Sequence, residues 1–181
     1  MFYEYKHKIY PSYLKDGNAI SYIVPIASYF CKGNGLDIGG TKDWHFPGAR
    51  HINIINDDKY HAMNIPKGKY DFIISSHTLE HLENPNKALK YWTKHIKKGG
   101  ILYLYLPHYN MEYWTFDNPK HKHFFHSKHI VTELMLLGYK NIICSGQDMY
   151  WSFSVVGQKD KVEKPYNSKN EPPMGRKRAD I

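Results

Sequence analysis

Two short runs of almost continuous apolar residues constrain this fold most strongly. They span residues 70–75 and 101–106. Runs of this kind are typical of strands that are buried on both faces, as in a parallel sheet. Between them, residues 84–98 have apolar side chains at helical spacing, begin with a capping asparagine and end at Gly99 and Gly100. A strand, a helix and a second strand in this order predict an α/β fold with a doubly wound, mostly parallel sheet.

The rest of the chain extends this alternation. Helices are predicted at 12–30 and 127–137, and strands at 36–38, 51–55, 141–144 and 152–157. Only about a dozen residues separate the first two of these strands, so we expect the first crossover to be very short or to lack a helix. Residues 1–158 are predicted to form one domain, and 159–181 a disordered basic tail.

Charge and cysteine content narrow the class of protein. The 181 residues carry a formal net charge of +8, which could indicate an anionic partner such as nucleic acid. Much of the excess lies in 159–178, where we expect the lysines simply to be solvated, so a nucleic-acid partner is less favoured. The chain has two cysteines and no apolar run near the ~18 residues that cross a bilayer. We therefore expect a cytoplasmic protein that does not enter a membrane.

Three segments at the predicted strands belong together. They read LDIGGT at 36–41, YDFIISSHTLEHL at 70–82 and KKGGILYLYLPH at 97–108. In this order and spacing they resemble the class I S-adenosylmethionine (SAM)-dependent methyltransferases, in particular the small methyltransferase-domain group whose fourth motif reads HxLEH. The resemblance covers residues 33–158. It implies a Rossmann-like sheet that ends in an antiparallel hairpin, with SAM as the cofactor.

The resemblance also implies a cofactor site beyond the carboxyl ends of the strands. Its expected residues are Asp37, Gly39, Gly40, Asn53, His61, Ser75 and Ser76. The first three would lie beneath the methionine end of SAM, and the two serines near the sulfonium. Asn53 and His61 stand at the positions that meet the ribose and the adenine.

Two histidines are the candidate catalytic bases. By the same resemblance His77 lines the cleft, and Pro107 and His108 border the acceptor site. A base is needed when the methyl acceptor is a hydroxyl or a protonated amine. Imidazole titrates near neutral pH, so His77 and His108 suit this task. We expect the acceptor to be a small polar molecule, such as a sugar or another metabolite.

Differences from the family pattern leave alternatives open. Thr41 stands where a further glycine is usual, Asn53 lacks the charge of the usual ribose carboxylate, and His61 replaces an acidic residue. These substitutions are compatible with a binding module that has lost catalysis. The net charge motivates a third class, a nucleic-acid methyltransferase. However, 75–78 read SSHT rather than the Asp/Asn-Pro-Pro-aromatic signature of base-amine methylation.

The histidine-rich loop at 108–126 raises the question of a metal site. The densest cluster is His121, His123, His126 and His129, with His108 upstream. Its spacing matches no conventional ligand motif, so we predict no metal and favour a lid over the acceptor pocket. The order of His77, Glu80 and His81 also differs from the zinc-protease motif, and no further ligand is evident in the sequence. A structural role for Glu80 and His81 is at least as compatible with the pattern.

Overall fold

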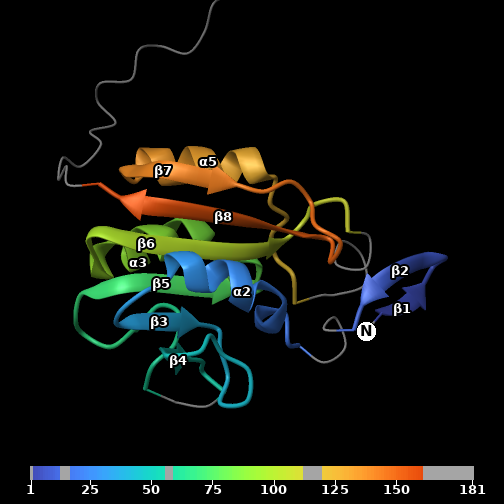
Figure 1. Cartoon of the computed structure of the whole chain (residues 1–181), viewed down its shortest axis with the longest axis horizontal. Helices are drawn as coiled ribbons and strands as arrows, with labels where there is room; N and C mark the ends of the chain where they lie inside the picture. Colours follow the sequence, from blue (N-terminus) through green and yellow to red (C-terminus); the bar gives the residue numbers. More distant parts are fainter. Residues whose placement is uncertain (1, 13–16, 56–58, 112–119, 161–181) are drawn as a thin grey trace, which may run out of the picture.

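A computed structural model describes residues 2–12, 17–55, 59–111 and 120–160. Its elements are β1 (Phe2–Tyr5), β2 (Lys8–Pro11), α2 (Ile20–Phe30), β3 (Gly35–Ile38), β4 (Ala49–Ile52), β5 (Tyr70–Ser76), the 3-10 helix η1 (Leu79–His81), α3 (Pro85–His95), β6 (Ile96–Pro107), α5 (Ser127–Leu136), β7 (Tyr139–Cys144) and β8 (Ser152–Lys159). Six strands form one sheet in the order β4-β3-β5-β6-β8-β7, and β1 and β2 form a separate hairpin (Figure 1).

The direction of the strands confirms the predicted α/β class. β4, β3, β5 and β6 are parallel to one another, and β8 runs antiparallel to both β6 and β7. The chain therefore has the Rossmann-like, mostly parallel sheet with a terminal antiparallel hairpin that the sequence indicated. Between Ile38 and Ala49 no helix forms, as the short spacing predicted. No helix in the described part of the chain is long and apolar enough to cross a bilayer.

Alternate side chains of the central strands supply two separate cores. Ile73 and Leu104 belong to one core, which α3 and α5 cover with Trp92 and Leu134. Phe72 belongs to the second core, on the opposite face of β5, because successive residues of a strand point to opposite faces. This second core is covered by α2 and by Tyr10 from β2. Helices on both faces explain why residues 72–74 of β5 and 101–106 of β6 form continuous apolar runs.

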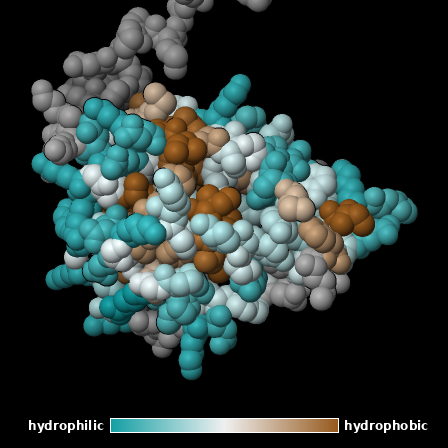
Figure 2. Space-filling view, in the orientation of Figure 1, coloured by the Kyte–Doolittle hydropathy of each residue, from teal (hydrophilic) through white to brown (hydrophobic). Residues whose placement is uncertain are grey.

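The α2 face is covered less completely than the α3 and α5 face. A groove of about 410 Å³ runs between α2 and the β7–β8 connection. Its lining includes Ile26 and Met149, whose side chains are exposed. Figure 2 shows apolar side chains gathered over this side of the molecule, between polar neighbours.

The N-terminal part of the chain differs from its prediction. The helix expected at 12–30 begins at Ile20 and runs through Pro25 to Phe30. Residues 17–19 are not helical, and 13–16 lie outside the described residues. Gly17 has a φ of +78°, a conformation that a helix does not contain. The hairpin of β1 and β2, upstream of that helix, had no recognised signal in the sequence.

The boundary between α3 and β6 was also predicted wrongly. The helix ends at His95 rather than Lys98, and β6 already starts at Ile96, which pairs with Tyr70. Gly100 lies inside this strand, where a Cβ would come within 2.8 Å of the Asp71 carbonyl oxygen. Its role is thus a close approach of two backbones and not the end of a helix.

The other boundaries lie near their predicted positions. The strand expected at 51–55 is β4, which starts two residues earlier and ends at Ile52. Lys159, expected to begin the tail, is the last residue of β8. The predicted tail otherwise falls on 161–181, outside the described residues.

Candidate active site

A tight turn after β3 brings the ends of two strands together. Gly39 has a φ of +100°, a region that side-chain-bearing residues rarely adopt. A Cβ on Gly39 would lie 1.7 Å from the Oγ1 atom of Thr78, which follows β5. The Gly39 amide donates to the carbonyl of Ile52 over 2.8 Å. The turn therefore fits only glycine, and it packs against both neighbouring strand ends.

Asp37 is a buried carboxylate directly beneath this turn. Only 1 % of the residue is exposed. Its Oδ2 atom accepts the backbone N–H of Phe46 at 2.7 Å, and its Oδ1 atom has no hydrogen-bond partner among the described residues. Burial raises the pKa of Asp37 to about 7, although the Phe46 amide and the nearby His45 oppose the shift. An unmatched buried acceptor of this kind is costly unless a ligand satisfies it.

A small pocket opens over Asp37. It is narrow, with a volume of about 20 Å³, and its lining residues are Gly17, Ile20, Asp37, Gly39, Gly40, Trp44 and Ser76. The hydroxyl of Ser76 is buried and, like Asp37 Oδ1, has no hydrogen-bond partner in the described ranges. The structure thus brings together four of the predicted cofactor residues, with two unsatisfied polar atoms among them.

The other three predicted cofactor residues have local partners. Ser75 donates its hydroxyl to the Ile38 carbonyl at 2.9 Å and ties β5 to the end of β3. Asn53 donates its amide to the Gly39 carbonyl at 2.8 Å and accepts from the Ile55 amide. His61 accepts the Met63 N–H through Nδ1, within the turn that it begins. Ser75 and Asn53 thus hold the backbone of the site, whereas the hydrogen bond of His61 stays within residues 61–64.

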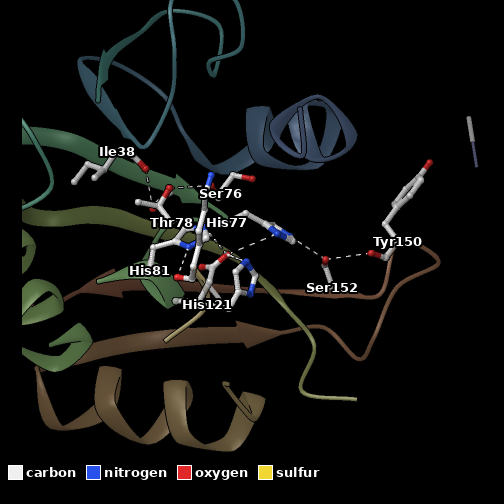
Figure 3. A network of polar contacts seen from close by, with 11 residues as sticks. Ile38, Ser76, His77, Thr78, His81, His121, Tyr150 and Ser152 are labelled. Carbon is white, nitrogen blue, oxygen red and sulfur yellow. Dashed lines mark hydrogen bonds and ion pairs between the residues drawn. The ribbon is translucent and has the colours of Figure 1, made fainter. Parts of the chain in front are cut away.

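His77 lies in a polar network at the carboxyl end of β5 (Figure 3). Its φ of +45° turns the chain sharply after the strand. The Nε2 atom is 3.0 Å from Ser152 Oγ, and the Nδ1 atom is 3.7 Å from Glu80 Oε1. Burial, followed by the neighbouring His121 and His81, holds the pKa of His77 well below its usual value. The ring is therefore neutral at physiological pH.

The second candidate base, His108, lies apart from this network. Its ring packs edge-on against Phe153, and its Nδ1 contacts the side chain of Asn110. Phe153 and Ser152 are consecutive residues of β8, so their side chains point to opposite faces of the sheet. Since His77 contacts Ser152 and His108 contacts Phe153, the structure does not bring the two histidines together.

A residue from the histidine-rich loop joins the network instead. His121 is buried, and its Nε2 atom is 3.9 Å from Oε1 of the equally buried Glu80. Backbone amides of Lys122 and His123 both donate to the Glu80 carbonyl, which fixes this loop against η1. No sequence spacing signals a contact between residues about forty positions apart. The predicted lid falls largely on 112–119, outside the described residues.

Comparison with known proteins gives this architecture a family. The model of a family described as "Methyltransferase domain" matches residues 31–142, more than half of the 181 residues. The chain belongs to the methyltransferase-domain family. It is thus a SAM-dependent methyltransferase of class I, as the three sequence segments indicated. Comparison with the curated proteins found no match.

Solved structures confirm the fold of this methyltransferase. A SAM-dependent methyltransferase from Thermotoga maritima, described as a possible histamine N-methyltransferase, has a TM-score of 0.61 at 15% identity, over 82% of this chain and 93% of its own. A SAM-dependent methyltransferase from Archaeoglobus fulgidus has a TM-score of 0.56 at 16% identity, over 77% of this chain and 92% of its own. The N-methyltransferase NodS from Bradyrhizobium japonicum, in complex with S-adenosylhomocysteine, has a TM-score of 0.51 at 14% identity, over 80% of this chain and 86% of its own.

The pocket residues suit one end of SAM. The amino acid end of SAM carries an ammonium group, and its sulfur is positively charged. Asp37 and Ser76 offer acceptor oxygens that lack hydrogen-bond partners among the described residues, and the Gly39 turn exposes backbone without a side chain. At the ribose position the fit is weaker, because Asn53 has no charge and its amide is already bonded to Gly39.

Proposed function

We propose that this methyltransferase holds the methionine end of SAM in the pocket over Asp37 and methylates a small polar molecule, such as a sugar or another metabolite. The observation that carries the proposal is the pair of buried acceptors, Asp37 Oδ1 and Ser76 Oγ, beside the Gly39–Gly40 turn. Both lie at the carboxyl ends of β3 and β5, where ligands of doubly wound sheets bind.

The chemistry requires alignment more than functional groups. SAM supplies a methyl group bound to a positively charged sulfur. The acceptor attacks the methyl carbon in line with the carbon–sulfur bond, which breaks and releases S-adenosylhomocysteine. Asp37 would bind and orient the positively charged end of the donor, and Ser76 would fix its position. Because both atoms are buried, their hydrogen bonds are stronger than they would be in water.

His77 is the candidate base that adjoins this pocket. It follows Ser76 directly, and its ring is neutral, although burial lowers its pKa and so weakens it as a base. His108 contacts the opposite side of the sheet, on Phe153, so we place it second. The hydroxyl and imidazole groups of Ser152 and His77 suit a polar acceptor.

Calorimetric titration of the full chain with SAM and S-adenosylhomocysteine tests the donor site. We expect micromolar binding, weakened about 5- to 10-fold by Ser76→Ala, since a neutral hydrogen bond contributes roughly 1 kcal/mol. Gly146→Ala is the matched control, because a Cβ there meets no atom within 4 Å. Equal affinity of wild type and Ser76→Ala would place the donor elsewhere. No binding of either ligand at millimolar concentration would reject the pocket altogether.

Transfer of a radiolabelled methyl group tests the acceptor class. We expect labelled products in a metabolite fraction and none in RNA or DNA. Label in nucleic acid, with binding that weakens steeply as salt rises, would favour a nucleic-acid methyltransferase and reject the small acceptor.

Both cysteines of the described chain are free thiols, which supports the proposal that the protein acts in the reducing cytoplasm.

A further inference from the structure

Three potential metal ligands converge beside the candidate active site. They are Glu80 and His81 in η1 and His121 in the loop bonded to it, and their ligand atoms all lie within 4.8 Å of one another. The Nε2 atoms of both histidines are 3.9 Å from Glu80 Oε1. Figure 3 shows His77, His81 and His121 gathered at this point. The side chains of Glu80 and His121 are fully buried.

Glu80 lacks the hydrogen bonds that a buried carboxylate requires. Neither of its side-chain oxygens has a hydrogen-bond partner in the part of the chain that the structure describes. An isolated buried carboxylate is strongly destabilising, and proteins normally pair such a group or bind it to a metal.

His81 already has the hydrogen bond of a metal-bound histidine. Its Nδ1 atom is 2.9 Å from the carbonyl oxygen of Lys120, and only a protonated nitrogen can donate to a carbonyl. In the neutral ring the proton is then on Nδ1, and Nε2 directs a lone pair toward Glu80. A backbone carbonyl bound to the far nitrogen is the usual way in which proteins orient metal-binding histidines.

His77 is fixed in an equivalent way. Ser152 donates its one hydroxyl proton to the Tyr150 carbonyl, so Ser152 Oγ accepts from His77 Nε2. The Nδ1 atom of the neutral His77 ring therefore bears the lone pair, and this atom faces Glu80 Oε1 at 3.7 Å. Two imidazole lone pairs thus point at the same carboxylate oxygen. Lone pairs repel one another unless a positive species lies between them.

The spacing of the atoms favours a metal ion over a shared proton. A hydrogen bond from a protonated Glu80 would need an oxygen–nitrogen distance near 2.8 Å, and the three distances are 3.7, 3.9 and 3.9 Å. Ligands bound tetrahedrally to zinc at about 2.0–2.1 Å are separated by roughly 3.4 Å. The Glu80–His81 and Glu80–His121 distances therefore need a contraction of about half an ångström, and the ligand atoms of the two histidines, which lie within 4.8 Å of each other, must also approach.

We propose that Glu80, His81 and His121 bind one divalent transition-metal ion of the Zn²⁺ type, with His77 beside them. Two imidazole nitrogens and a carboxylate oxygen are ligands that zinc accepts. Three protein ligands leave one position of a tetrahedral site for water or another ligand. The side chain of His81 is 35% exposed, so the site can exchange with solvent. The sequence had indicated no metal, because the third ligand follows the first two by forty residues.

Zinc titration of the EDTA-treated full chain, followed by calorimetry and thermal unfolding, tests this site. We expect one ion per chain and a rise in Tm. Glu80→Gln, which preserves shape, should weaken zinc binding at least 10-fold. The exposed His129 is not part of the cluster, so His129→Ala is the matched control and should bind as wild type does. Equal zinc binding by wild type and Glu80→Gln would overturn the proposal.

A second measurement needs no variant, so it tests the site even if Glu80→Gln does not fold. Anomalous diffraction at the zinc edge from wild-type crystals should show a peak between Glu80, His81 and His121. A peak on other histidines only, or no zinc bound at micromolar concentration, would reject the site. Both measurements are made without SAM, so their failure would leave the proposed donor pocket untouched.

Discussion

At the scale of single residues, the site depends on polar atoms that the protein itself does not satisfy. Asp37 Oδ1 and Ser76 Oγ are buried without hydrogen-bond partners among the described residues. Groups of this kind lower the free energy of unfolding, which supports the proposal that a ligand completes them. By contrast, Ser75 and Asn53 donate to backbone carbonyls and stabilise the strand ends. The adjacent residues Ser75 and Ser76 thus differ, because Ser75 stabilises the fold and the hydroxyl of Ser76 is left for a ligand in the proposed site.

Asp37→Asn is expected to change how stability depends on pH. Burial raises the pKa of Asp37 from 3.8 to about 7. Between these values the folded state keeps a proton that the unfolded state loses, so the free energy of unfolding of the wild type falls as pH rises. A tenfold difference in proton affinity between the two states corresponds to about 1.4 kcal/mol. Above pH 7 the variant, which cannot ionise, should gain stability relative to the wild type.

Urea denaturation of both proteins without SAM, at pH 4.5 and at pH 7.5, measures this difference. We expect the stability of Asp37→Asn relative to the wild type to be greater at pH 7.5. A difference that is the same at both pH values would show that Asp37 ionises normally in the folded protein.

At the scale of elements, one side chain connects two neighbouring strands. Asn53, directly after β4, donates to the carbonyl of Gly39, directly after β3. In the family pattern an acidic residue stands here, and the resemblance alone suggested a lost ribose contact. The structure supplies another reason for asparagine, since a carboxylate could not donate to that carbonyl.

The boundary between α3 and β6 also depends on a neighbouring strand, because Ile96 enters the sheet through its pairing with Tyr70.

Asn53→Asp should therefore destabilise the fold. The substitution keeps the acceptor for Ile55 but places a negative oxygen against the Gly39 carbonyl, at an expected cost of about 1–3 kcal/mol. Asn64→Asp is the control, since Asn64 also donates to a backbone carbonyl, that of Lys59, from an exposed position. Chemical denaturation checks both variants. If Asn53→Asp kept full stability and bound SAM more tightly, Asn53 would be a lost ribose ligand instead.

At the scale of the whole molecule, the N-terminal hairpin docks onto the residue that precedes β8. Tyr10 of β2 is fully buried, and its ring centroid is 5.4 Å from that of Trp151. Trp151 also donates its indole N–H to the carbonyl of Ile9 at 3.0 Å. Segments about 140 residues apart in the sequence are thus packed together next to β8. This contact closes the second core beyond the end of α2.

Tyr10→Ala should lower the free energy of unfolding by about 3 kcal/mol, because it removes a large, fully buried aromatic side chain. Ile9→Ala is the matched control, since the Ile9 side chain is largely exposed, and we expect a change near zero. Urea denaturation followed by circular dichroism compares them. Equal stabilities of the two variants would mean that the hairpin adds nothing to the stability of the domain.

The sequence by itself determined the sheet, two of its covering helices and the Gly39 turn. Continuous apolar runs, a capping asparagine and paired glycines act over a few neighbouring residues, so they can be recognised along the chain. The tertiary structure decided which polar residues meet. His77 and His108 were both predicted as bases but contact different residues of β8, Ser152 and Phe153. The distant loop of His121 is held at Glu80 by backbone hydrogen bonds. Such contacts depend on which distant segments the fold brings together, and this cannot be predicted from the spacing of neighbouring residues.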